Sequence, residues 1–146
     1  MELKFIWELP DSMSVKEVES YFNKFLDFAE KYDDFKNLDE IKIIEILEAL
    51  DQLAERQGYT YELLDKKLMQ RVENLIFKIW KIENEEIVDI ISVIVIKLGL
   101  KNVFNYMKNV LKDELPQNIK IIIQETIDEA GEHIEDPYHS LKKFIR

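Results

Sequence analysis

The chain has 146 residues, of which 30 are acidic and 20 are basic, so its net charge at neutral pH is −10. This length suits a single domain that buries a core without crosslinks, and the absence of cysteine excludes disulfides. Because an acidic surface repels nucleic acids and anionic membranes, we expect neither as a partner, although many proteins are acidic only to stay soluble.

The first ten residues differ from the rest of the chain. Leu3, Phe5 and Trp7 occupy alternate positions, which is the period of a strand, and Pro10 ends the run. No second strand pattern follows, so residues 1–10 are expected to form an extended segment over the helices. The N-terminus lacks the pattern of a signal peptide, and no apolar run approaches the ~20 residues of a membrane span, so a cytoplasmic location is expected.

Three helices are predicted in the first half of the chain. The capping-box pattern from Ser14 to Glu17 begins the first, which we expect to end near Tyr32. The second is predicted over residues 38–57. Apolar residues spaced by three and four positions predict the third helix over residues 61–81.

The second half is predicted to hold three or four more helices, over residues 84–98, 100–111, 116–130 and, in the tail, 138–146. Apolar residues point in nearly every direction from the helix at 84–98, so we expect this helix at the centre of the fold. Asp89 and Ser92 share a face of that helix and are expected to form an internal hydrogen bond.

Three glycines follow apolar stripes of helical spacing. The residues four, eight and twelve positions before Gly58, Gly99 and Gly131 are apolar, which predicts that each glycine ends a helix in the left-handed conformation. Their recurrence indicates one helical unit used three times. Short connections require antiparallel neighbours, so we predict an all-α fold of six to seven antiparallel helices over residues 1–146. The helices would stack as hairpins, in a HEAT-like array or an irregular bundle.

Carboxylates gather opposite the apolar stripes of two predicted helices. One acidic face consists of Glu45, Glu48, Asp51 and Glu55, and the other of Glu125, Asp128, Glu129 and Glu132. The helices at 61–81 and 100–111 are mixed or basic instead. If like arms of the hairpins align, the acidic faces merge into a surface that steers a basic partner. The alternative is that they are solvated helix faces balanced by nearby lysines.

Tyr59 and Tyr61, just after Gly58, are further candidate contacts. Tyrosine is enriched among residues that dominate binding energy, although aromatic residues at hairpin ends more often cover a core. We therefore include both tyrosines with the acidic faces as candidate partner-binding residues.

No catalytic, metal-binding or cofactor-binding pattern stands out. Glu125, Glu129 and His133 follow one another at helical spacing, but a di-iron centre needs two Glu-x-x-His motifs and the sequence has none. We also expect Gly131 to turn His133 away from that face. His139 has no arranged partners, and no glycine-rich phosphate loop is present. We therefore expect no enzyme activity, no metal and no cofactor.

The second half of the chain resembles a known family. The sequences EEIVDII at 85–91, KLGL at 97–100, FNYM at 104–107 and DPY at 136–138 are similar to all-helical immunity proteins of bacterial polymorphic toxin systems. The resemblance implies a cytoplasmic inhibitor that binds a cognate toxin domain, basic in many such systems, and blocks its active site or substrate path. Two other classes stay open: a helical-repeat adaptor that binds a peptide or partner subunit, and an enzyme or ligand carrier with an internal pocket.

Overall fold

The computed structural model describes residues 3–32, 35, 37–81 and 83–137. Over these ranges the chain forms six α-helices and one short 3-10 helix, with no strand, so the predicted all-α class is confirmed. The elements are η1 (Lys4–Glu8), α1 (Val15–Ala29), α2 (Glu40–Gly58), α3 (Lys66–Ile79), α4 (Glu85–Leu98), α5 (Lys101–Val110) and α6 (Gln117–Ala130). The helix predicted over 138–146 lies outside the described residues.

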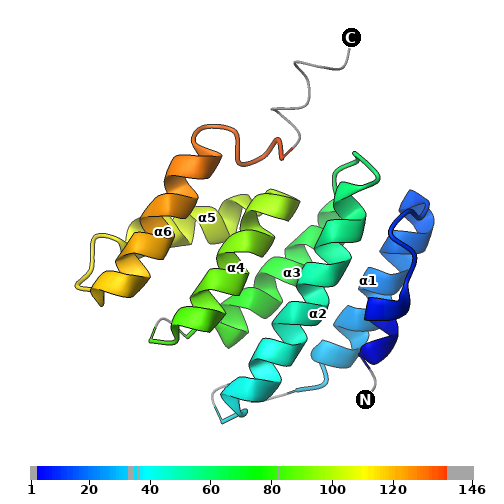
Figure 1. Cartoon of the computed structure of the whole chain (residues 1–146), viewed down its shortest axis with the longest axis horizontal. Helices are drawn as coiled ribbons and strands as arrows, with labels where there is room; N and C mark the ends of the chain where they lie inside the picture. The colour runs from blue at the N-terminus through cyan, green and yellow to red at the C-terminus, as the bar shows by residue number, and fades with distance from the viewer. Residues whose placement is uncertain (1–2, 33–34, 36, 82, 138–146) are drawn as a thin grey trace.

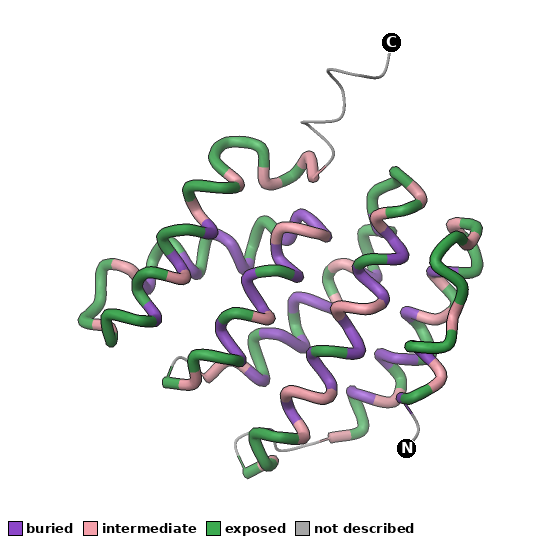
Figure 2. The backbone as a smooth tube through the Cα atoms, viewed as in Figure 1, coloured by how far each residue is buried: buried purple, intermediate pink, exposed green. Residues whose placement is uncertain are grey.

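The helices form two layers (Figure 1). In one layer α4 lies between α2 and α6, and in the other α3 lies between α1 and α5. Successive helices therefore alternate between the layers, as in a stack of helical hairpins. Buried side chains of both layers form one hydrophobic cluster, and Figure 2 shows the buried stretches along the sides of the helices that face each other.

The central place predicted for the helix at 84–98 is confirmed, because α4 contacts α2, α5 and α6. Six aliphatic residues of α4 are buried: Ile87, Val88, Ile91, Ile94, Val95 and Leu98. One stripe of α4, which includes Asp89 and Val93, nevertheless faces solvent. This helix is therefore covered on three sides, and its fourth side belongs to the outer face of its layer.

Side-chain caps set where several helices begin. Ser14 and Glu17 form the predicted capping box, each side chain accepting from the other's backbone N–H at 3.2 Å. Asn84 accepts from Ile87 N at 3.0 Å, as predicted for α4. The third helix begins at Lys66 rather than near residue 61, because Asp65 caps its first turn through two backbone N–H groups.

The extended N-terminal segment is a wrong prediction. Leu3 and Ile6 are both buried and lie three residues apart, which is the repeat of a 3-10 helix. Ile6 N donates to Leu3 O at 3.1 Å, and η1 packs on α2. The buried guanidinium of Arg56 donates to Leu9 O at 3.0 Å, which fixes the end of this segment to α2.

The glycine caps are confirmed at one position of three. Gly99 ends α4 in the left-handed region, with φ 69° and ψ 46°. Gly131 also has a positive φ, 55°, but its ψ of −130° lies outside that region. Gly58 is the last residue of α2, and the positive φ of that turn, 54°, falls on Tyr61. Thr60 Oγ1 donates to Gln57 O at 2.7 Å, so the helix end is satisfied without a left-handed glycine.

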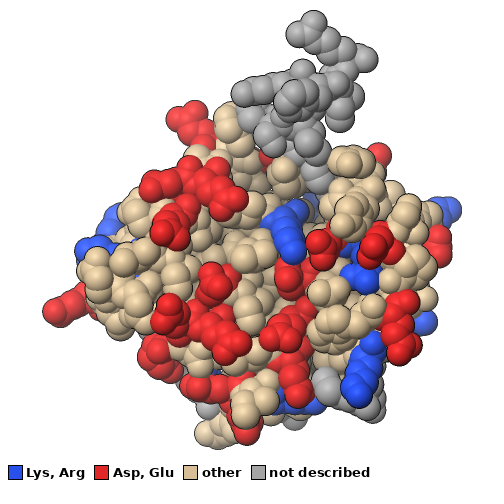
Figure 3. Space-filling model, viewed as in Figure 1, with Lys and Arg blue, Asp and Glu red and all other residues tan. Residues whose placement is uncertain are grey.

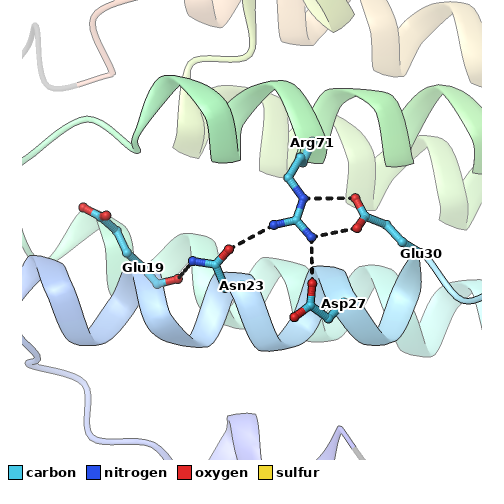
Figure 4. A network of polar contacts seen from close by, with 5 residues as sticks. All are labelled: Glu19, Asn23, Asp27, Glu30 and Arg71. Atoms are coloured by element: carbon cyan, nitrogen blue, oxygen red, sulfur yellow. Dashed lines mark hydrogen bonds and ion pairs between the residues drawn. The ribbon is translucent and has the colours of Figure 1, made fainter.

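Polar contacts join neighbouring helices of the second layer. Arg71 on α3 donates to Asn23, Asp27 and Glu30 at the α1 side, at distances from 2.7 to 3.1 Å (Figure 4). The hydrogen bond to Glu30 is the largest cause that raises the pKa of the Arg71 guanidinium above its usual value. Arg71 therefore fixes α1 against α3 through a two-bond contact with one carboxylate.

A buried glutamate joins α3 to α5. Glu73 is only 6% exposed, and its Oε2 accepts from Asn102 N at 2.8 Å and Val103 N at 3.0 Å. The first turn of α5 has no side-chain cap of its own. Glu73 supplies that cap from the neighbouring helix, with a negative charge at the positive end of the helix dipole.

Candidate protein-interaction surface

The outer face of the α2, α4 and α6 layer is rich in carboxylates, which Figure 3 shows spread over these three helices. We call this face the acidic surface. Its carboxylates are Glu45, Glu48, Asp51, Glu55, Glu86, Asp89, Glu125, Asp128 and Glu129. Glu132 lies exposed in the turn after α6. The structure thus aligns the two faces expected from sequence, with α4 between them.

The carboxylates of α4 were missed at the sequence level. Asp89 was expected to bond Ser92 internally, but Asp89 is exposed and the Ser92 hydroxyl donates to Val88 O at 2.8 Å. The apolar composition of α4 concealed its narrow polar stripe. That stripe completes the acidic surface, because it lies between the acidic faces of α2 and α6.

Each helix of this layer also exposes an aliphatic side chain. The exposed fractions are 68% for Ile41, 40% for Val93 and 47% for Ile121. Their helical positions place them on the same outer face as the carboxylates. Partner surfaces combine such apolar contacts with a polar rim, so this arrangement is chemically suited to bind a protein with basic and apolar groups.

Some of the carboxylates have partners within the chain. Asp51 Oδ1 accepts from Lys97 Nζ at 2.8 Å, which links α2 to α4, and Lys42 lies 3.6 Å from Glu45. In the part of the chain that the structure describes, six exposed carboxylates of the acidic surface have no ion pair or side-chain hydrogen bond: Glu48, Glu55, Glu86, Asp89, Glu125 and Glu129. These six are therefore the most available to an external cation.

A groove of about 120 Å³ runs between α4 and α6 within the acidic surface. Asp89, Glu125 and Glu129 line it, and Thr126 lies at its buried side with its hydroxyl donating to Ile122 O. The groove concentrates negative charge where two helices meet. Among the described residues, no group of three or more His, Asp or Glu side chains is arranged to hold a metal ion.

The Glu125, Glu129 and His133 series does not form one site. Glu129 and His133 line a separate cavity of about 260 Å³ beside Pro137, whereas Glu125 lines the groove and not this cavity. His133 lies in the turn after Gly131, outside α6, and this turn folds back toward the last turn of the helix, so that His133 and Glu129 line the same cavity.

The tyrosines lie at one end of the acidic surface. Tyr59 follows the last residue of α2 and continues the outward stripe of Glu48 and Glu55, and Tyr61 comes two residues later. Both tyrosines are exposed, together with Leu63. Their position is compatible with a partner that extends past the end of α2.

The other layer carries the opposite charge on α3 and α5. We call the lysines of α3, of α5 and of the turn after α5 the lysine surface: Lys66, Lys67, Lys78, Lys101, Lys108 and Lys112. The sole carboxylate of α3 is the buried Glu73, and α5 has none. The predicted contrast therefore places α3 and α5 in one layer and the acidic helices α2, α4 and α6 in the other, whereas α1, beside α3, carries charges of both signs.

A larger cavity, about 570 Å³, lies where the first turns of α3 and α5 meet. Leu63 and Met69 give it apolar walls, and Lys66, Lys101 and Glu73 give it charged ones. Sequence reasoning missed this cavity, because its walls come from separate segments of the chain, which lie in the ranges 63–73 and 99–102 and at residue 135.

None of the helices in the described ranges is long and apolar enough to cross a membrane. Comparisons of the chain with models of protein families, with curated proteins and with solved structures found no match.

Proposed function

We propose that this chain is an immunity protein that neutralises a basic toxin domain by binding it through the acidic surface. The observation that carries the proposal is the merging of carboxylates from α2, α4 and α6 into one face that also exposes Ile41, Val93 and Ile121. The sequence resemblance of the second half to immunity proteins supports the same function.

The proposed mechanism is electrostatic capture followed by steric blocking. Carboxylates on one face attract a basic domain over several ångströms, which raises the association rate more than the affinity. The exposed aliphatic residues then lose water against the partner, which slows dissociation. A standard interface buries about 800 Å² on each partner. The total accessible surface of this chain is 8725 Å², so one face of the molecule suffices.

The test pairs this chain with the toxin domain encoded beside its gene. Cells that express both are expected to grow, whereas cells that express the toxin alone are not. Surface plasmon resonance is expected to give an association rate that falls at least about tenfold between ~0.05 M and ~0.5 M salt.

A charge-reversed variant sharpens this test. Glu48→Lys with Glu55→Lys removes two unpaired carboxylates of the acidic surface, and the association rate is expected to fall about tenfold or more at low salt. The matched control is Glu83→Lys with Glu114→Lys, which alters net charge equally in exposed loops outside the acidic surface. Absence of binding to the adjacent toxin, or equal rates for both double variants, would contradict the proposal.

A second candidate, a peptide-binding adaptor, is favoured by the 570 Å³ cavity between α3 and α5. A peptide held there would depend on the apolar walls, so Met69→Glu would abolish its binding. The acidic-surface variant Glu48→Lys with Glu55→Lys would leave that binding unchanged. The two functions therefore predict opposite responses to the same pair of variants.

A further inference from the structure

The lysine surface on α3 and α5 has no role in the function proposed above. Within the described residues, Lys66, Lys67, Lys78 and Lys112 form no ion pair. Two further lysines are engaged: Lys101 lies 3.3 Å from Glu135, and Lys108 lies over the ring of Phe104. The remaining four ammonium groups are available to an anionic surface.

Exposed aromatic residues lie within this lysine surface. The ring of Tyr106 on α5 meets the rings of Phe77 and Trp80 edge to face, each at 5.5 Å between centroids. Phe77 is 41% exposed and Tyr106 is 38% exposed, although large aromatic side chains are usually mostly buried. The surface therefore combines unpaired lysines with an aromatic centre, at the seam between α3 and α5.

We propose that a second copy of this chain occupies the lysine surface with its acidic surface. The two surfaces lie on opposite layers of the molecule and are complementary in kind. Carboxylates with exposed aliphatic residues on one face correspond to lysines with exposed aromatic residues on the other. Glu48 and Glu55 of the acidic surface and Lys67 and Lys112 of the lysine surface form no ion pair within the chain, so each can take an opposite charge from another copy.

The net charge of −10 does not prevent this contact. A chain of this length has a radius of gyration near 15 Å, which corresponds to a sphere of radius about 19 Å, so two copies in contact lie about 38 Å apart between centres. That separation is nearly three Debye lengths at ~0.05 M salt, and screening reduces the overall repulsion to roughly a fifteenth. Opposite charges that meet across the contact lie within a few ångströms of each other, where screening is weak.

The contact uses two different surfaces, so it does not close at a dimer. Each added copy leaves one acidic surface and one lysine surface free, and association continues as an open row. Under the proposed function, a toxin domain competes for the same acidic surface and disperses the row. That consequence rests on the proposed function, whereas the self-association itself does not.

Sedimentation velocity of the full chain alone tests the inference. At about 0.05 M salt the average mass is expected to rise from 17.5 kDa past twice that value between ~10 μM and ~1 mM protein. At about 0.5 M salt the chain is expected to remain a monomer over the same range. A monomer at every concentration and at both salt levels would overturn the proposal.

Two double variants separate the surfaces. The acidic-surface variant is Glu48→Lys with Glu55→Lys, and the lysine-surface variant is Lys67→Glu with Lys112→Glu. Lys67→Glu places a negative charge in the first turn of α3, and Glu55→Lys places a positive charge in the last turn of α2. Both charges are favourable to the helix dipole, so these two reversals are expected to preserve folding. Each variant alone is expected to be monomeric.

A mixture of the two variants is the decisive sample. One retains the lysine surface and the other retains the acidic surface, so together they are expected to form a one-to-one dimer that grows no further. Association of either variant alone, or no dimer in the mixture, would overturn the proposal. Lysine-dependent binding of a single-stranded oligonucleotide by a chain that stays monomeric would also overturn it, and would assign the lysine surface to nucleic acid.

These outcomes are separate from those of the proposed function, because no toxin is present in the sedimentation samples. A chain that binds its adjacent toxin but never self-associates refutes this inference alone. A chain that self-associates but binds no toxin refutes the proposed function alone.

Discussion

Removal of the Glu73 carboxylate is expected to destabilise the protein more than removal of any exposed glutamate. Glu73 Oε2 accepts from Asn102 N and Val103 N, and its Oε1 accepts from Asn102 Nδ2 at 3.1 Å. Hydrogen bonds to a charged group contribute about 1.5–3 kcal/mol each. Asn102 is exposed, so water replaces its two hydrogen bonds to Glu73 after truncation and their loss costs little. The buried Val103 N–H is left without its acceptor, so we expect Glu73→Ala to cost about 3 kcal/mol.

Urea and thermal unfolding followed by circular dichroism measure this loss. For a chain of this size, about 3 kcal/mol corresponds to a fall in Tm of roughly 6–12 °C. Glu73→Gln keeps an acceptor oxygen but not the charge, so its loss should be about half as large. Glu48→Ala, at an exposed helical position, is the matched control and should change stability by less than about 0.5 kcal/mol. Equal losses for Glu73→Ala and the control would refute the capping role, as would unchanged hydrogen exchange at Val103 N.

Four further predictions concern backbone conformation and contacts between elements. Gly58→Ala should raise the free energy of unfolding by about 0.5–1 kcal/mol, because Gly58 is helical with open space around its Cα. Gly99→Ala should lower the free energy of unfolding by about 2 kcal/mol or more, because φ at Gly99 is 69° and an added Cβ would lie 2.6 Å from Ile134 O. Urea unfolding measures both glycine variants, and equal effects of the two would refute both predictions. Arg71→Lys should lower the free energy of unfolding by about 1 kcal/mol, and by less at high salt, because lysine cannot form the two-bond contact with the Glu30 carboxylate. Arg71→Ala should cost at least as much in the same urea unfolding experiment. Arg56→Ala should cost about 2 kcal/mol and speed hydrogen exchange of the η1 backbone before the core; unchanged exchange there would contradict its role as the contact that holds η1.

Sequence patterns predicted the helices where local chemistry determines them. The caps at Ser14 and Asn84 and the period of the apolar residues are properties of a single helix, and the structure confirms both caps. The prediction of a left-handed glycine at the end of the helix was wrong at Gly58, because the Thr60 hydroxyl donates to the carbonyl of Gln57 instead. The prediction at η1 was wrong because this segment also has apolar residues at every third position, Leu3, Ile6 and Leu9, which is the repeat of a 3-10 helix. Contact with α2 decides between the two patterns.

The candidate site was predicted only in part, for a related reason. The acidic faces of α2 and α6 are visible in sequence because their carboxylates recur at helical spacing. The contribution of Asp89 and the exposure of Val93 depend on which side of α4 its neighbours leave uncovered, which periodicity does not specify. Glu73 likewise resembles any helical glutamate until α5 is placed against it.

The separation of charge follows from the order of the helices along the chain. From α2 to α6, carboxylate-rich helices alternate with lysine-rich ones, and successive helices of the stack enter alternate layers. From α2 to α6, alternation in sequence therefore becomes separation in space, with most carboxylates on one side of the shared core and most lysines on the other. A chain that needed only solubility would gain nothing from this order, since mixed charges on every helix serve solubility as well. Segregated charge instead supports the function proposed above, in which the carboxylates of α2, α4 and α6 attract a basic partner.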